Sequence, residues 1–160
     1  MPEYSIRRIR AEDNPGVAEL IRTVMPEFGA KGPGFAINDP EVAHMFEAYQ
    51  EMGHAYFVVT DGKILGGGGI APLAGEAGVC ELRKMYFLEE IRGLGLGQKV
   101  MDLCLRTARE LGYQSCYLET LKSMEKAKAL YLRNGFEPLP SPRGNTGHFS
   151  CDSWYQKNIC

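Results

Sequence analysis

A glycine-rich turn lies where a strand is expected to give way to a helix. Gly93, Gly95 and Gly97 alternate with leucines directly after Arg92. Glycines at such a turn allow successive backbone N–H groups to point into one concavity, and a helix N-terminus adds a partial positive charge. The arginine guanidinium suits phosphate oxygens. The turn therefore predicts a phosphate or pyrophosphate site, although a tight turn that binds nothing would carry the same glycines.

Two common nucleotide-binding motifs do not fit this turn. The dinucleotide motif G-x-G-x-x-G, counted from Gly93, places Gln98 where its last glycine should stand. The motif G-x-x-x-x-G-K-[ST] also meets Gln98 at its second glycine, and Val100 follows Lys99 in place of serine or threonine. The turn therefore argues against a dinucleotide or a P-loop nucleotide as the ligand.

The strand expected at 79–88 changes its apolar face partway along. Cys80 and Leu82 share one face of a regular strand, whereas Met85 and Phe87 share the other. One extra residue between Leu82 and Met85, a β-bulge, would bring both pairs to one core and leave backbone N–H groups unpaired in the sheet. A strand buried on both faces would explain the same pattern.

The remaining elements follow from periodicity and from turn residues. Val17, Leu20, Ile21 and Val24 recur at helical spacing after the cap signal Asn14-Pro15. Helices are expected near 15–25, 40–49, 96–111 and 124–134, with Asp39-Pro40 as the cap signal of the second and Ser123 as the cap of the fourth. Strands are expected near 4–6, 55–60, 63–70, 79–88, 114–120, 136–139 and 148–159. This order predicts a single mixed α/β domain that covers 1–160.

Two separated motifs give the chain a resemblance to a known family. The R-G-x-G-x-G turn follows a strand that ends at 85–88, and the segment from Ala127 to Phe136 resembles A-x-x-L-Y-x-[KR]-x-G-F. Together they resemble the GCN5-related N-acetyltransferases (GNAT), of the bacterial small-molecule or amino-acid type. The resemblance implies a central mixed sheet of about seven strands and about four helices, splayed between strands 4 and 5, where acetyl-CoA enters.

The resemblance also implies which residues bind acetyl-CoA. Backbone groups of the bulged strand would hold the thioester and the pantetheine arm, and the turn would hold the pyrophosphate. Arg133 would meet the 3′-phosphate, with an exposed helix charge as the alternative. Met124 stands where many members have an asparagine that binds pantetheine, and Thr120 or a main-chain group would substitute for it. The complete set is Met85, Tyr86, Phe87, Arg92, Gly93, Leu94, Gly95, Leu96, Gly97, Gln98, Thr120 and Arg133.

Proton transfer is assigned in the same way. Tyr131 matches the tyrosine that protonates the leaving CoA thiolate in the family. Glu81 is the candidate base, acting through water, with a solvated strand residue as the alternative. The ending from 144 to 155 is similar to that of a bacterial subgroup. There, His148 and Asp152 would share a strand face beside the acceptor, or anchor a loop, and His148 is an alternative base.

The acceptor is expected to be a small amine or an amino-acid derivative. A peptide or protein N-terminus or a lysine is the alternative, and so is a non-catalytic acyl-CoA-binding module. A net charge of −2 argues against nucleic acid. The lack of a long apolar run argues against a leader or a membrane span. Five cysteines without metal spacing predict no metal and a cytoplasmic protein. Many relatives are dimers, so a homodimer is expected.

Overall fold

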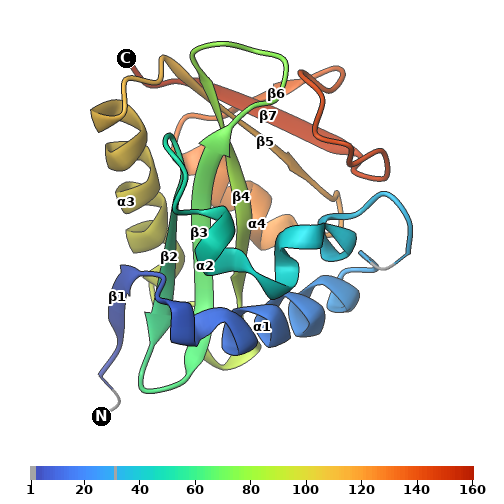
Figure 1. Cartoon of the computed structure of the whole chain (residues 1–160). Coiled ribbons are helices and arrows are strands. Elements are labelled where there is room, and N and C mark those ends of the chain that lie inside the picture. The colour runs from blue at the N-terminus through green and yellow to red at the C-terminus, as the bar shows by residue number, and fades with distance from the viewer. Residues whose placement is uncertain (1–2, 31) are drawn as a thin grey trace.

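A seven-stranded mixed sheet forms the centre of the protein (Figure 1). The computed structural model describes residues 3–30 and 32–160. The strand order is β1-β2-β3-β4-β5-β7-β6, and β4 and β5 are parallel whereas the other neighbours are antiparallel. The strands are β1 (Ser5–Arg8), β2 (Ala55–Thr60), β3 (Ile64–Pro72), β4 (Val79–Phe87), β5 (Ser115–Thr120), β6 (Glu137–Leu139) and β7 (Ser153–Asn158). The sheet predicted from the sequence is confirmed.

Helices cover both faces of this sheet (Figure 1). They are α1 (Asn14–Glu27), α2 (Met45–Ala48), α3 (Leu96–Glu110) and α4 (Glu125–Arg133). The apolar stripe of α3, with Val100 and Cys104, joins Leu82, Met85 and other sheet residues in the larger core cluster. The α1 stripe, with Val17 and Ile21, packs on the opposite face in a second cluster. No helix in the described part of the chain is long and apolar enough to cross a membrane.

Three local predictions were wrong. The helix expected at 40–49 is a 3-10 turn over Pro40–Ala43 and then the short α2, because the backbone leaves the helical region at His44. Ser123 does not cap α4, since its hydroxyl donates to the Phe28 carbonyl at 3.0 Å. The final strand starts only at Ser153, so His148 and Asp152 lie in the preceding loop and share no strand face.

The sheet splits between β4 and β5. Their pairing covers only Val79↔Ser115, Cys80↔Cys116 and Glu81↔Tyr117. Beyond that point β4 continues against β3 as far as Phe87, whereas β5 continues against β7 as far as Thr120. The two strands therefore diverge into a wedge, and the splay predicted between strands 4 and 5 is confirmed.

A β-bulge interrupts β4 beside this wedge. Gly67 pairs with Tyr86 and Gly69 pairs with Arg83, so the single residue Gly68 faces both Lys84 and Met85. Lys84 has a φ of +50° and is the one non-glycine residue with positive φ in residues 3–30 and 32–160. The extra residue returns Met85 to the core that already contains Leu82. The bulge inferred from the parity switch is confirmed.

Glycines in β3 make room for side chains from both neighbouring strands. A Cβ atom at Gly67 would lie 2.7 Å from the Tyr56 hydroxyl, and one at Gly66 would lie 2.5 Å from Phe87 Cδ1. Real Cβ atoms do not approach other atoms so closely, so side chains here would displace Tyr56 and Phe87. The glycine run thus lets the Tyr56 ring lie over β3 and reach the bulge on β4.

Candidate active site

Two hollows meet at the wedge. The larger is a cleft of about 680 Å³ between the bulged end of β4, the glycine turn and α4. The smaller is a cavity of about 50 Å³ that is lined in part by Glu81 and Glu119. Met85, Tyr86, Met124 and Tyr131 line both hollows. The two hollows therefore adjoin at these four side chains.

The larger cleft has the form of an anion site at the glycine turn. Gly93 and Gly95 have φ values of 82° and 80°, which glycine adopts without strain, and Gly95 directly precedes the 15-residue helix α3. A Cβ atom added at either glycine would meet no heavy atom within 4 Å, so this side of the turn is open. The helix N-terminus directs unpaired N–H groups and a partial positive charge toward a phosphate group placed here.

Most of the residues predicted to bind acetyl-CoA line this cleft. The exceptions are Leu94, whose side chain faces outward with 54% exposure, and Thr120, which lines the smaller cavity. Arg92 lines the cleft but is already engaged, since it donates to the Phe87 carbonyl and to Glu27, each at 2.9 Å. Its guanidinium also lies over the Phe28 ring, 5.5 Å from the centroid.

Tyr131 lies at the junction of the two hollows. Its side chain is buried and packs edge-on against Phe136. Burial raises the pKa of its phenol, so the hydroxyl carries its proton at neutral pH. Thr120 Oγ1 lies 3.6 Å from the Met124 sulfur nearby. Tyr131 therefore offers a protonated hydroxyl at the place where the two ligands would meet.

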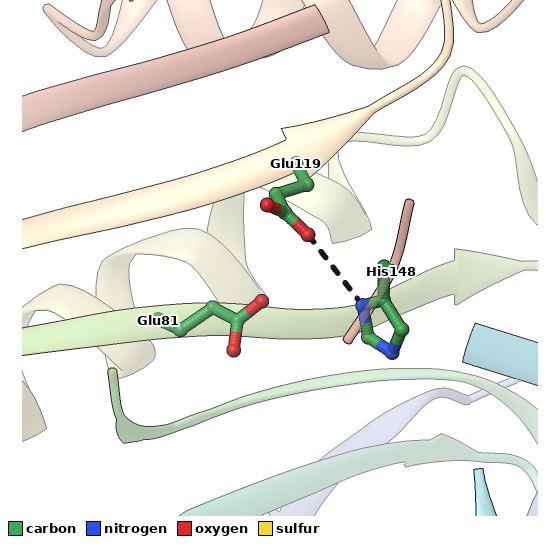
Figure 2. A group of neighbouring side chains, drawn as sticks. All are labelled: Glu81, Glu119 and His148. Atoms are coloured by element: carbon green, nitrogen blue, oxygen red, sulfur yellow. Dashed lines mark ion pairs between the residues drawn. The ribbon is translucent and has the colours of Figure 1, made fainter. Parts of the chain in front are cut away.

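Glu81, Glu119 and His148 converge in the smaller cavity (Figure 2). One ligand-type atom from each lies within 4.8 Å of the others. Glu81 and Glu119 come from opposite sides of the wedge, and His148 is supplied by the loop before β7. His148 Nδ1 lies 3.6 Å from Glu119 Oε1, and Nε2 lies 2.9 Å from Asp39 Oδ1.

The two glutamates differ in their proton affinity. Burial raises the pKa of Glu81, although the paired Arg83 at 2.7 Å opposes the shift. Burial also acts on Glu119, but hydrogen bonds from His148, Thr146 and Tyr117 outweigh it and lower its pKa. Neighbouring carboxylates with pKa values pushed apart in this way suit different roles in proton transfer.

His148 is a cation in this arrangement. Burial favours the neutral ring, but the carboxylates of Asp39 and Glu119 outweigh it and raise the pKa of His148 to about 9. A histidine that is protonated at neutral pH cannot accept another proton. Both ring nitrogens face carboxylates, which favours the protonated ring, and the role of His148 as an alternative base stays a prediction.

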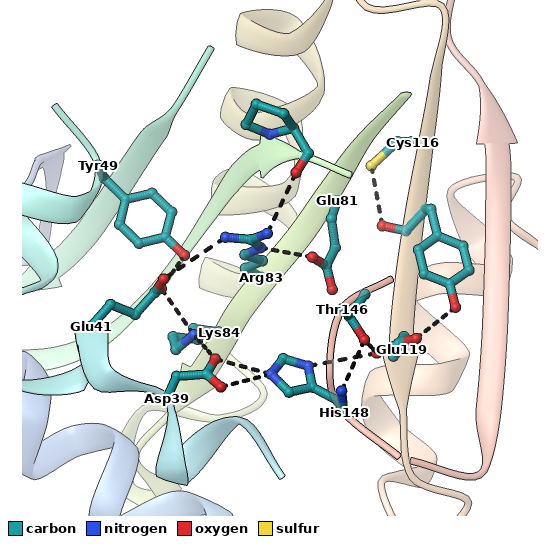
Figure 3. Close-up of polar contacts among 12 residues, drawn as sticks. Asp39, Glu41, Tyr49, Glu81, Arg83, Lys84, Cys116, Glu119, Thr146 and His148 are labelled. Carbon is teal, nitrogen blue, oxygen red and sulfur yellow. Dashed lines mark hydrogen bonds and ion pairs between the residues drawn. The ribbon is translucent and has the colours of Figure 1, made fainter. Parts of the chain in front are cut away.

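Two further cations complete the network (Figure 3). Lys84 Nζ lies 2.8 Å from Asp39 Oδ2 and 2.9 Å from Glu41 Oε2. The network thus sets four carboxylates (Asp39, Glu41, Glu81 and Glu119) against three cations (Arg83, Lys84 and His148). Glu81, Glu119 and His148 are also of types that bind divalent metals. Arg83 already neutralises Glu81, and the expected absence of a metal stays a prediction.

Sequence reasoning missed part of this cavity and misplaced another part. Asp152 does not line it, because its carboxylate accepts a hydrogen bond from the Lys122 backbone N–H at 2.8 Å and anchors the loop. Asp39, which pairs with His148 but does not line the cavity, was recognised only as a helix-cap signal. Glu119 was missed because the register that sets Tyr117 opposite Glu81 follows only from the fold.

Comparisons with known proteins agree with this geometry. The acetyltransferase (GNAT) family matches residues 17–136. The chain is 45% identical over 150 residues to the N-acetyltransferase YjgM of Escherichia coli (strain K12), covering 92% of this chain and 90% of that protein. A GNAT acetyltransferase from Staphylococcus aureus Mu50 superposes with a TM-score of 0.87 at 21% identity over 99% of this chain and 100% of the other. YncA of Salmonella typhimurium, solved with its cofactor acetyl-CoA, superposes with a TM-score of 0.77 at 17% identity over 98% and 94%.

Proposed function

The chain belongs to the GNAT acetyltransferase family and is an acetyl-CoA-dependent N-acetyltransferase; from this premise we propose that it acetylates a primary amine of a small molecule or amino-acid derivative by direct attack. One observation carries the proposal. A long cleft with an anion-binding turn and a small acidic cavity meet at Tyr131. The cleft suits acetyl-CoA, and the cavity suits the amine.

In the proposed reaction the amine nitrogen attacks the thioester carbonyl carbon. The new C–N bond forms, the C–S bond breaks, and CoA leaves as a thiolate. An acceptor that enters as an ammonium ion must lose two protons, one before the attack and one as the amide forms, and the thiolate must gain one. Beyond Glu81, β4 has no partner strand on the side of the wedge, so backbone N–H groups of the bulge that point to this side would be free to bind a ligand. These groups would stabilise the developing oxyanion, an effect of about 3 kcal/mol per donor in other enzymes.

Glu81 is the proposed base. Its pKa is raised by burial, so it binds a proton more readily than an ordinary carboxylate does. It lines the cavity, and only 3% of the residue is exposed. The amine proton would reach Glu81 through water. Glu119 keeps its charge and would stabilise the ammonium form of the acceptor as it enters.

Tyr131 is the proposed acid. Its hydroxyl is protonated and lies where both hollows meet. A phenol with a raised pKa is a weak donor to a thiolate, whose pKa is about 8.5. Its contribution therefore depends on being held close to the sulfur before the C–S bond breaks.

The cavity supports a small acceptor. Its volume of about 50 Å³ has room for the end of one primary amine rather than a folded segment of polymer. The surplus of carboxylates in the network favours an acceptor that arrives as a cation. A lysine side chain or a peptide N-terminus would satisfy the same chemistry and is the alternative. Assembly as a homodimer and the extent of the domain over 1–160 stay predictions.

A panel of amines assayed by thiol release from acetyl-CoA tests the proposal. Amino acids, short polyamines and aromatic amines form one arm, and peptides with a free N-terminus or a lysine form the other. Release with small amines that exceeds release with peptides supports the proposal. Preference for peptides would move the function to the alternative. Tight acetyl-CoA binding with no release in either arm would indicate a binding module.

A further inference from the structure

Lys84 occupies a backbone conformation that disfavours a side chain. Its φ of +50° lies in the left-handed region, where every other described residue with positive φ is glycine. Glycine would adopt this conformation at the bulge without strain. Strain of this kind persists only where surrounding contacts hold the residue in place. The lysine side chain therefore needs an explanation beyond the formation of the bulge.

Lys84 is held at both ends, and Figure 3 shows the contacts of its ammonium group. Its ammonium, on a side chain that is only 1% exposed, pairs with Asp39 at 2.8 Å and with Glu41 at 2.9 Å. Its carbonyl accepts a hydrogen bond from the buried Tyr56 hydroxyl at 2.8 Å. Tyr56 reaches this carbonyl because Gly67 has no side chain. These three bonds fix both the direction of the side chain and the orientation of the following peptide.

The ammonium end and the carbonyl end of Lys84 belong to different parts of the site. Asp39 also contacts His148, so the ammonium of Lys84 is joined to the acidic cavity. Met85 follows Lys84 in the chain and lines both hollows. Because the bulge turns at Lys84, the direction of the Met85 N–H depends on how Lys84 is held. One residue thus connects the carboxylates of the acceptor cavity to the wall that faces the donor.

We propose that Lys84 is a positioning residue, held by Asp39, Glu41 and Tyr56, that aims the Met85 N–H at the thioester carbonyl. This inference rests on the proposed function, in which backbone groups of the bulge hold that carbonyl. Lys84 is assigned no part in the proton transfers, which are proposed for Glu81 and Tyr131. Its side chain matters because it couples the shape of the acceptor cavity to the polarisation of the thioester.

Two variants and one control test the inference. Lys84→Gly keeps the backbone conformation free of strain but removes the ammonium, and Tyr56→Phe removes only the hydroxyl that binds the Lys84 carbonyl. Tyr113→Phe is the matched control. The Tyr113 hydroxyl also donates to a backbone carbonyl, that of Gly53 at 2.8 Å, but this contact lies outside the wedge. The probe is acetyl-CoA carrying carbon-13 at the acetyl carbonyl, observed by NMR when bound to each protein.

We expect the carbonyl signal of acetyl-CoA to move downfield when it binds to wild type or to Tyr113→Phe. In Lys84→Gly and Tyr56→Phe at least about half of that shift should be lost, because the carbonyl accepts a weaker hydrogen bond in these variants. With the best amine of the panel, kcat should fall about 10-fold while KM for acetyl-CoA changes less than about twofold.

Lys84→Gly with the wild-type shift and kcat would overturn the inference, and so would an equal loss in Tyr113→Phe. If the wild-type protein shifts the carbonyl signal but none of the amines in the panel causes thiol release, the proposed function alone is refuted. In that case the shift in the variants still decides the role of Lys84.

Discussion

The donor cleft and the acceptor cavity are built in opposite ways. The cleft is formed largely by one stretch of chain, with glycines, backbone N–H groups and a helix N-terminus between 85 and 98. The charged side chains of the cavity come from three separate segments, around residues 81–84, 119 and 148, and a fourth segment at 39–41 pairs with them from outside the cavity. The cleft therefore depends on backbone conformation, whereas the cavity depends on charge balance. A substitution should therefore impair the cleft or the cavity without impairing the other, because the two depend on different interactions.

Glu81→Gln should give the largest difference between the effect on turnover and the effect on acetyl-CoA affinity. The amide keeps the shape of the side chain but cannot take the amine proton, so kcat should fall roughly 10²- to 10³-fold. Acetyl-CoA affinity, measured by calorimetry, should stay near wild type because Glu81 does not line the cleft. Glu90→Gln is the control, since Glu90 is exposed on the far side of the bulge. Normal turnover in Glu81→Gln would show that the base lies elsewhere.

Tyr131→Phe tests the point where the two regions meet. Loss of the hydroxyl removes the proton donor to the thiolate, so kcat should fall about 10²-fold while acetyl-CoA affinity stays within about twofold. The loss should shrink when the donor is an acetyl thioester with a more acidic thiol, because that leaving group needs less protonation. A loss that is the same for both donors would count against Tyr131 as the acid.

Gly95→Ala should affect the cleft alone. A side chain at a φ of 80° costs about 1–2 kcal/mol of conformational free energy. Distortion of the turn should weaken acetyl-CoA binding about 10-fold by misaligning the N–H groups at the start of α3. The KM for the amine should change little. Gly112→Ala is the matched control, because Gly112 also has positive φ, at 88°, and lies at the other end of α3. Equal losses of acetyl-CoA affinity in Gly95→Ala and Gly112→Ala would contradict the interpretation of the turn as an anion site.

The smallest expected effect is a pH dependence of stability that belongs to the cavity. The pKa of His148 is raised to about 9 in the folded protein, above the ordinary value of 6.5. Its contribution to stability is therefore fully present below pH 6.5 and is lost as the pH rises through about 9. Melting curves should show wild type losing more stability than His148→Gln between these pH values. Parallel curves would mean that His148 is not held as a cation.

The sequence allowed prediction of the cleft better than of the cavity, for a physical reason. Backbone-built sites leave local signals, so the turn and the parity switch in β4 identified the donor side. Charge-built sites depend on which distant segments the fold brings together. Nothing near Asp39 indicates that it contacts His148, 109 positions away. Lys84 gave no signal either, because its left-handed backbone follows from the bulge and not from its residue type.

Boundaries failed where tertiary contacts overrode local preference. Asp39-Pro40 does mark the start of a 3-10 turn, but the Asp39 side chain pairs with Lys84 and does not cap the turn, and the backbone leaves the helical region at His44. Ser123 likewise donates to the Phe28 carbonyl and leaves α4 without a side-chain cap.

The short pairing between β4 and β5 makes the sheet mechanically uneven. Only three residue pairs join the half that contains β1 to β4 with the half that contains β5 to β7. This short seam lies inside the sheet and not at its edge, and we expect local opening and early exchange of amide hydrogens along it. A ligand that spans the wedge would bridge the two halves much as an extra strand does. Binding should therefore slow exchange along the seam more than it raises the overall melting temperature.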